Sequence, residues 1–198
     1  MILEKHSDLE GKHAFLGASK YHWINYDLDK LRESYFNFQA TQKGTELHEL
    51  ACQLIKYGIK LPRSKRALNC YVNDIIDLKA KGFPMYTEQP LIYSYNCFGT
   101  ADAIGCTYGD VPYEENALYI FDLKTGKIPA SFHQLEVYAA LFCLNYKLKP
   151  SDIFYIEFRL YQGNEVIVGT PTSKTITDIM DKIILFDEEI KKMNDERR

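Results

Sequence analysis

Residues 118–127, LYIFDLKTGK, begin as an apolar segment and end with closely spaced opposite charges. The first four residues are strong β-formers, which predicts a buried strand. Asp122 and Lys124 follow two positions apart, so they project from the same face of that strand. Burying either charge alone is costly. The segment therefore predicts a further charged group that compensates this acid and base.

A second acid lies on the strand expected just before this one. Residues 97–106, CFGTADAIGC, read as a strand and carry Asp102. Pairing as a hairpin would bring Asp102 and Asp122 to one end of the sheet. Two convergent carboxylates repel each other unless a cation lies between them, and open oxygen sites suit Mg²⁺ or Mn²⁺. Lys124 could then hold a nucleophilic water or stabilise charge on a phosphoryl oxygen.

An ordinary ion pair on an edge strand would also explain the D-x-K spacing at 122–124. The tripeptide alone therefore leaves both interpretations open, and the rest of the chain must distinguish them.

Periodicity and turn residues predict the remaining elements. Two helices come first, then three strands, a helix that is apolar nearly all round, two more strands and a last helix. Their expected ranges are 44–58, 64–82, 86–96, 97–106, 117–125, 131–146, 153–161, 165–170 and 173–192. This order predicts an α/β or α+β domain whose helices cover a mixed sheet.

Capping and turn residues set several of these boundaries. Thr45 is the expected N-cap of the first helix, and Ser64 that of the second. Gly82 is expected to end the second helix. Gln162 and Gly163 are expected to form the hairpin turn between the last two strands. The first 40 residues are rich in aromatic side chains and are expected to form a helical or irregular layer on the core.

Composition fits a single folded domain. The chain has 198 residues, 46% hydrophobic and 14% aromatic, with a net charge of −3, which argues against a nonspecific DNA coat. Its five cysteines include no C-x-x-C pair, which favours a reduced cytoplasmic setting over a disulfide framework or zinc site. No apolar run reaches the roughly 18 residues of a membrane span, and the first residues lack a signal-peptide core.

Four motifs in this chain resemble those of the RecB-type branch of the PD-(D/E)XK nucleases, the group of the RecB nuclease domain and many phage exonucleases. The family's motifs are G-T-x-x-H on a helix, G-x-x-D on a strand, D/E-x-K on the next strand and Q-x-x-x-Y on the following helix. This chain has GTELH at 44–48, GTAD at 99–102, DLK at 122–124 and QLEVY at 134–138. All four occur in the family's order, on the elements expected from periodicity.

The resemblance implies a role for each matching residue. His48, Asp102 and Asp122 would ligate Mg²⁺ or Mn²⁺, with the backbone carbonyl of Leu123 as a further ligand. Lys124 would orient or activate the attacking water. If Thr45 caps its helix, His48 also lies in the first turn, where the positive helix end favours the neutral imidazole that a metal requires.

Other polar residues are implied less directly. Gln134 and Tyr138 share one helical face and would line the DNA path. Glu88 matches an acid that relatives often carry before the first strand, and Lys127 could contact phosphate. Each has a plainer alternative, such as satisfying a buried helix or forming a solvated turn. The basic run RSKR, 63–66, is either a contact to the DNA backbone or a surface patch at a helix end.

The resemblance implies a restriction-endonuclease-like core, a mixed sheet of about five strands flanked by helices, in one domain over 1–198. Within it, 1–43 would form the N-terminal layer, 44–170 the catalytic core and 173–196 the C-terminal helix. The expected activity is a Mg²⁺- or Mn²⁺-dependent exonuclease of phage-type recombination or DNA processing. An endonuclease of the same fold and an inert DNA-binding module remain alternatives.

Cofactors and partners follow from the same resemblance. Some relatives carry a four-cysteine iron–sulfur cluster with cysteines near the C-terminus, but this chain has none after Cys143, so no cluster is expected. DNA is the expected partner, with a single-strand annealing protein as a second candidate and a homo-oligomer as an open alternative. The expected setting is the cytoplasm of a bacterial host of a phage or prophage.

Overall fold

The computed structural model describes residues 14–126 and 129–196, in two compact units with the boundary between Glu46 and Leu47. The first unit contains the 3-10 helix η2 (Ala18–Asn25) and the start of helix α1 (Leu28–Tyr57). Its aromatic residues form a cluster of their own, in which the ring centroid of Phe15 lies 5.1 Å from that of Tyr35 and 5.3 Å from that of Phe38. The described part of this segment is largely helical, and the expected helical or irregular layer on the core stays a prediction.

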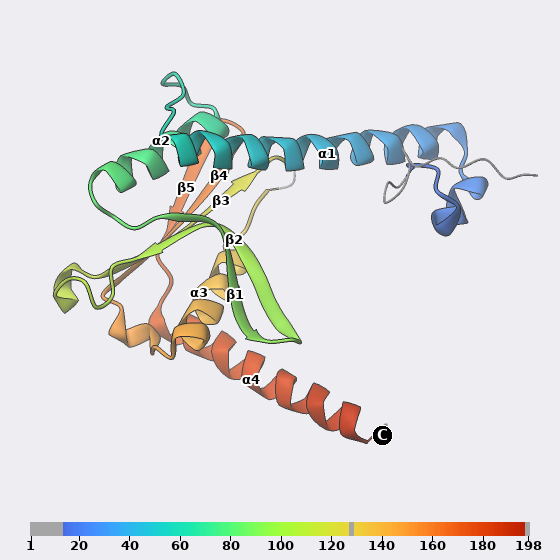
Figure 1. Ribbon diagram of the computed structural model, residues 1–198. Helices are drawn as coiled ribbons and strands as arrows, with labels where there is room; N and C mark the ends of the chain where they lie inside the picture. Colours follow the sequence, from blue (N-terminus) through green and yellow to red (C-terminus); the bar gives the residue numbers. More distant parts are fainter. Residues whose placement is uncertain (1–13, 127–128, 197–198) are drawn as a thin grey trace, which may run out of the picture. The chain divides into compact units, whose positions relative to one another are not determined.

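The second unit is built on one five-stranded mixed sheet flanked by helices, which confirms the expected fold class (Figure 1). The strands lie in the order β1-β2-β3-β4-β5. The pairs β1–β2, β2–β3 and β4–β5 are antiparallel, and β3–β4 is parallel. The elements after α1 have the following bounds: α2 Ala67–Ala80, β1 Tyr86–Ser94, β2 Cys97–Cys106, η3 Tyr113–Glu115, β3 Ala117–Lys124, α3 His133–Tyr146, η4 Pro150–Asp152, β4 Tyr155–Gln162, β5 Glu165–Gly169 and α4 Ser173–Asp195.

Strand β3 is the middle strand of this sheet, and both of its faces are buried. Leu118 and Ile120 pack in the cluster that contains residues of α3 and α4. Phe121 and Leu123 pack in the opposite cluster, with α2 and the last turns of α1. Figure 1 shows the two groups of helices on the two sides of the sheet. A strand covered on both faces must be apolar at successive positions, which explains why the segment ahead of Asp122 does not alternate.

Helix α1 begins much earlier than the sequence predicts. It starts at Leu28, where the Asp27 carboxylate accepts a hydrogen bond from the Lys30 amide at 2.7 Å. Thr45 lies inside the helix, and its hydroxyl donates to the carbonyl of Thr41 at 3.3 Å. The expected N-cap at Thr45 is therefore wrong, because a long helix tolerates a single interior glycine at a cost of about 1 kcal/mol. His48 does not lie in a first turn, and the argument from the helix end does not apply to it.

Two further boundaries differ from the prediction. Ser64 precedes α2 by three residues and accepts a hydrogen bond from the Arg66 amide at 3.2 Å instead of capping the helix. The turn between β4 and β5 is shifted by one residue, because Gln162 pairs with Glu165 and leaves Gly163 in the turn with a φ of +61°. Both boundaries are displaced by at most three residues from the predicted position, because turn residues next to the helix or strand make different hydrogen bonds from those expected.

The expected end of α2 is confirmed. Helix α2 stops at Ala80, and Gly82 follows with a φ of +87°, where its amide donates to the carbonyl of Lys79. In the described ranges, no helix is both long and apolar enough to cross a membrane.

A buried acid fastens the tip of the β1–β2 hairpin to α4. Asp187 is 2% exposed and accepts hydrogen bonds from the Ser94 hydroxyl at 2.6 Å and the Asn96 amide group at 2.9 Å. The Lys191 ammonium lies 2.6 Å from its other oxygen. This four-residue group, here called the hairpin latch, joins segments about ninety residues apart in the chain.

Gly105 of β2 has no room for a side chain. A Cβ there would overlap the carbonyl oxygen of Pro84 and lie 2.7 Å from the Met85 sulfur. We expect Gly105→Ala to lower the free energy of unfolding by at least about 2 kcal/mol, because backbone must move to admit the methyl group. Urea unfolding would measure it. Gly126→Ala, where a Cβ would meet nothing within 4 Å, is the matched control, and equal stability of the two variants would contradict the packing argument.

The hairpin latch predicts an acid-sensitive contribution to stability. Hydrogen bonds from Lys191, Ser94 and Asn96 lower the pKa of Asp187 from 3.8 to about 2. Because the folded protein lowers this pKa, the ionised Asp187 carboxylate stabilises the fold at any pH above the ordinary pKa of 3.8. This contribution is lost as the pH falls from about 4 towards 2. Asp187→Asn should therefore flatten the pH dependence of unfolding in this window. Asp178→Asn, which removes an exposed partner of Lys174, should leave the dependence unchanged; an unchanged profile for Asp187→Asn would disprove the linkage.

Candidate functional site

Three acids form one row across the sheet. The pairs Thr87–Ala103 and Ala103–Phe121 define the register of β1, β2 and β3. One position further along lie the three acids, which are Glu88 of β1, Asp102 of β2 and Asp122 of β3. The expected convergence of Asp102 and Asp122 on neighbouring strands is therefore present, and β1 adds a third carboxylate beside them.

Asp102 lies where the ladder between β2 and β3 ends. Its carboxylate accepts a hydrogen bond from the backbone amide of Leu123 at 3.0 Å. Beyond the last backbone pair, Ala103–Phe121, this side chain therefore takes the place of a backbone acceptor. Burial, and then the charge of Asp122, raises the pKa of the Asp102 carboxyl. The amide of Leu123 thus contacts the site, and the role expected for its carbonyl stays a prediction.

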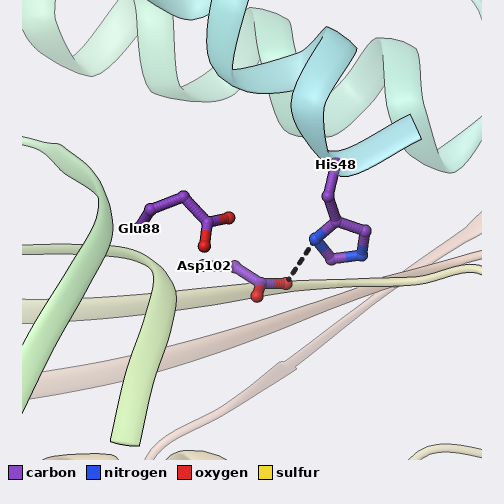
Figure 2. A group of neighbouring side chains, drawn as sticks. All are labelled: His48, Glu88 and Asp102. Atoms are coloured by element: carbon purple, nitrogen blue, oxygen red, sulfur yellow. Dashed lines mark ion pairs between the residues drawn. The ribbon is translucent and has the colours of Figure 1, made fainter. Parts of the chain in front are cut away.

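His48 reaches Asp102 from helix α1. Its Nδ1 atom lies 3.4 Å from Oδ2 of Asp102, and the two side chains are 28% and 16% exposed. Donor atoms of His48, Glu88 and Asp102 all lie within 4.8 Å of one another. Figure 2 shows the three side chains directed towards a common space. One imidazole and two carboxylates at this spacing form a group that could bind a divalent cation.

Glu88 has an unusual backbone conformation. Its φ is +50°, in the left-handed region that residues with a Cβ seldom adopt, although it lies inside β1. Strain of this kind typically costs about 1–3 kcal/mol and concentrates at functional sites. Here the strained residue is the one whose carboxylate completes the group with His48 and Asp102.

Asp122 joins a separate chain of hydrogen bonds. Its side chain is 2% exposed, and the Lys124 ammonium lies 2.9 Å from its Oδ2 and donates to its Oδ1 at 3.1 Å. The same ammonium donates to Gln134 at 2.6 Å, and Gln134 donates to the Tyr138 hydroxyl at 2.9 Å. The expected acid and base of β3 and the expected polar pair of α3 are thus in direct contact. Asp122 is not a member of the compact group formed by His48 and the other two acids.

The glycine of the GTAD motif has a packing reason. A Cβ on Gly99 would lie 3.0 Å from a ring carbon of Tyr138, closer than most such contacts. The absence of a side chain at Gly99 therefore lets the Tyr138 ring lie close against strand β2. The hydroxyl of the same tyrosine accepts the hydrogen bond from Gln134. Two motifs that are 39 residues apart in sequence thus meet in space.

Two site residues escaped the sequence analysis. Cys52 lies one helical turn after His48, and its thiol lies 3.7 Å from Oε1 of Glu88. Burial, and then the charge of Glu88, raises the pKa of this thiol to about 11. The H-x-x-x-C spacing in GTELHELAC is the signal that could have identified it, since residues four apart share a helical face.

Tyr71 of α2 is the second missed residue. It is 2% exposed and packs edge to face on Tyr161 at a centroid distance of 5.3 Å. Burial, and then the charge of Asp102, raises the pKa of its hydroxyl well above the ordinary value. Tyr71 lies among the apolar residues of α2, and its position in the sequence did not predict that Asp102 and Asp122 lie near it.

The remaining candidates are Lys127 and the basic run 63–66. Lys127 falls outside the described residues. The basic run 63–66 is exposed and lies in the segment just before α2, and no hydrogen bond in the described structure joins it to the acids.

Comparison of the chain with protein-family models, with curated proteins and with solved structures finds no match. The interpretation of the site therefore depends on the residues and their geometry.

The buried Asp122–Lys124 pair predicts a measurable coupling. Lys124→Met leaves the Asp122 carboxylate without its cation in a site that is nearly closed to solvent, and we expect a loss of about 2 kcal/mol in the free energy of unfolding. The double variant Asp122→Asn/Lys124→Met should cost less than the sum of the single variants. Urea unfolding in the presence of a chelator would measure all three.

The matched control for this cycle is Lys174→Met, because Lys174 pairs with Asp178 on the surface. It should change the unfolding free energy by less than about 0.5 kcal/mol. Strictly additive effects of the Asp122 and Lys124 variants would show that the pair is not coupled.

Proposed function

We propose that this protein is a metal-dependent DNA nuclease, with exonuclease activity, that hydrolyses phosphodiester bonds. The observation that carries the proposal is the row of Glu88, Asp102 and Asp122 in the strand register, with His48 on one side and Lys124 on the other. The four motifs that resemble those of RecB-type nucleases supply four of these five residues in the family's order, and Glu88 matches an acid that relatives often carry before the first strand, which supports the same conclusion.

The charges around the row support a bound cation. Among the residues that the structure describes, three carboxylates face the ammonium of Lys124, which makes this part of the site negative at neutral pH. Two unit charges 4 Å apart near a protein surface repel by about 4 kcal/mol, so a phosphodiester would be repelled from these acids. A divalent cation between the acids and the phosphate reverses the sign of this interaction.

The donor set fits Mg²⁺ or Mn²⁺. His48, Glu88 and Asp102 would hold the ion, because their donor atoms already lie within 4.8 Å of one another and both metals accept oxygen and imidazole ligands. Asp122 and the carbonyl of Leu123 are the further ligands that the resemblance implies. Oδ2 of Asp122 is buried and receives no hydrogen bond from the described residues, although the Lys124 ammonium lies beside it. Such an oxygen is suited to a cation.

The residues around the cation would have separate roles in the reaction. A bound cation would lower the pKa of a water and polarise a phosphoryl oxygen. Lys124, held by Asp122 and Gln134, presents an ammonium that can orient the water or stabilise charge growing on the phosphate. Gln134 and Tyr138 continue the same chain of hydrogen bonds along α3 and would contact the DNA.

The expected partners follow from this activity. DNA is the substrate, and a single-strand annealing protein would accept the strand that an exonuclease exposes in phage-type recombination. The setting proposed for this reaction is the cytoplasm of a bacterial host. A restriction-endonuclease-like identity of the fold is part of the same proposal.

The direct test is degradation of DNA with a labelled end. We expect the purified protein to release labelled nucleotides from linear DNA in Mg²⁺ or Mn²⁺ and to stop when a chelator is added. Asp102→Asn and Lys124→Met should each lower the rate at least about 100-fold, because the first removes a ligand of the cation and the second removes the ammonium that acts on the water or phosphate. Linear duplex, single strands and closed circular DNA would be compared, since only an endonuclease cleaves the closed circle.

The control variant is Asp178→Asn, which changes an acid of α4 whose partner is the exposed Lys174. Its rate should equal that of the unchanged protein. Full activity of either site variant, or activity that survives the chelator, would refute the proposal. DNA binding without cleavage in any metal would point instead to an inert module of the same fold.

A further inference from the structure

We propose that Cys52 is a fourth donor of the cation site, and that it lets Zn²⁺ close this site and inhibit the enzyme. The inference rests on the proposed function, because it concerns the same group of residues. It adds a regulatory cation of a different chemical class from the activating one, and it assigns a role to a thiol that the proposed reaction does not use.

The position of Cys52 on α1 brings it to the site. Cys52 follows His48 by four residues, so both side chains lie on one face of the helix. The Cys52 sulfur lies 3.7 Å from Oε1 of Glu88, and Nδ1 of His48 lies 3.4 Å from Oδ2 of Asp102. One turn of helix therefore supplies a nitrogen and a sulfur to carboxylates from two neighbouring strands.

Both spacings suit donors that share one ion. Zinc binds sulfur at about 2.3 Å and nitrogen or oxygen at about 2.0–2.2 Å in tetrahedral geometry, which places neighbouring donors roughly 3.3–3.6 Å apart. The measured separations, 3.7 Å for sulfur to oxygen and 3.4 Å for nitrogen to oxygen, lie close to this range. Cys52 is not among the donors that all lie within 4.8 Å of one another, so on coordination its thiol would turn from Glu88 towards His48 and Asp102.

The other cysteines have different surroundings. The Cys70 thiol donates to the carbonyl of Ser64, and the Cys106 sulfur accepts from the amide of Tyr108. Cys143 is completely buried in the core cluster. Among the described cysteines, Cys52 is the one whose thiol makes a hydrogen bond to a carboxylate.

The chemistry of the donors separates two classes of cation. Mg²⁺ prefers oxygen ligands and keeps several waters, so at His48, Glu88 and Asp102 it would leave positions open for water and phosphate. Thiolates favour Zn²⁺ and related ions. Zinc sites with four protein donors are closed, whereas catalytic sites keep one position open. When Zn²⁺ binds, a zinc–sulfur bond forms and the thiol proton leaves to solvent, so no position remains for the attacking water.

A spectroscopic titration tests this coordination without relying on activity. Co²⁺ is the probe for Zn²⁺, because a Co²⁺–thiolate bond gives a charge-transfer absorption in the near ultraviolet. We expect the full-length protein to show this band on addition of Co²⁺ and to lose it when Zn²⁺ is added. Cys52→Ser and Cys52→Ala should abolish the band, and Cys70→Ser should retain it. Circular dichroism would establish that each variant is folded.

Competition with a chromophoric chelator gives the affinity. The Cys52→Ser change should weaken Zn²⁺ binding by about tenfold or more, within the range seen when a metal site loses one supporting group. The Zn²⁺ concentration that halves Mg²⁺-dependent DNA degradation should rise by a similar factor. Absence of the band in the unchanged protein, its persistence in both Cys52 variants, or equal Zn²⁺ affinity would overturn the inference.

The two proposals fail separately. Degradation of DNA in Mg²⁺ without a cobalt–thiolate band would leave the nuclease proposal standing and remove the role of Cys52. A Cys52-dependent band without any DNA degradation would establish the thiol as a ligand and remove the nuclease proposal, together with the inhibitory role that rests on it.

Discussion

The hydrogen bond from the Leu123 amide to the Asp102 carboxylate is the contact on which the site depends. Backbone pairing between β2 and β3 stops at Ala103 and Phe121, and beyond that point the carboxylate takes the place of a backbone acceptor. One interaction therefore both ends the ladder and holds an acid at the junction of the strands. Extended by one position past Ala103, the register places Glu88 and Asp122 on the two sides of Asp102, so this carboxylate lies in the middle of the row.

The sequence predicted the order of the elements well, because the central strand and its neighbours have strong local signals. The apolar run before Asp122 reports a strand buried on both faces, and the hairpin before it could be recognised from β-forming residues alone. The meeting of Lys124 with Gln134 was foreseeable only from the motif order. It arises because the β3–α3–β4 connection returns the helix across the strand that precedes it.

Other features depend on long-range contacts that periodicity does not encode. Thr45 has the chemistry of an N-cap, yet the helix continues through it because the residues before Gly44 are equally able to form a helix. The left-handed conformation of Glu88 could not be read from a residue type that rarely adopts it. Cys52 looked like one of five scattered thiols until α1 was placed beside β1. For Thr45 the deciding residues are the ones just before it in the chain, whereas for Glu88 and Cys52 they lie on other elements of the fold.

The hairpin latch also has a consequence for the order in which the protein is made. Glu88 and Asp102 belong to the hairpin whose tip is fastened by Asp187, a residue about ninety positions further along the chain. On the ribosome, both acids emerge well before that anchor exists. The hairpin can pair early, but its tip gains its last partner only when α4 has been synthesised. Fastening of the hairpin tip is therefore a late event in biosynthesis, and a nascent chain without α4 would carry these two acids on a hairpin whose tip is not yet fastened.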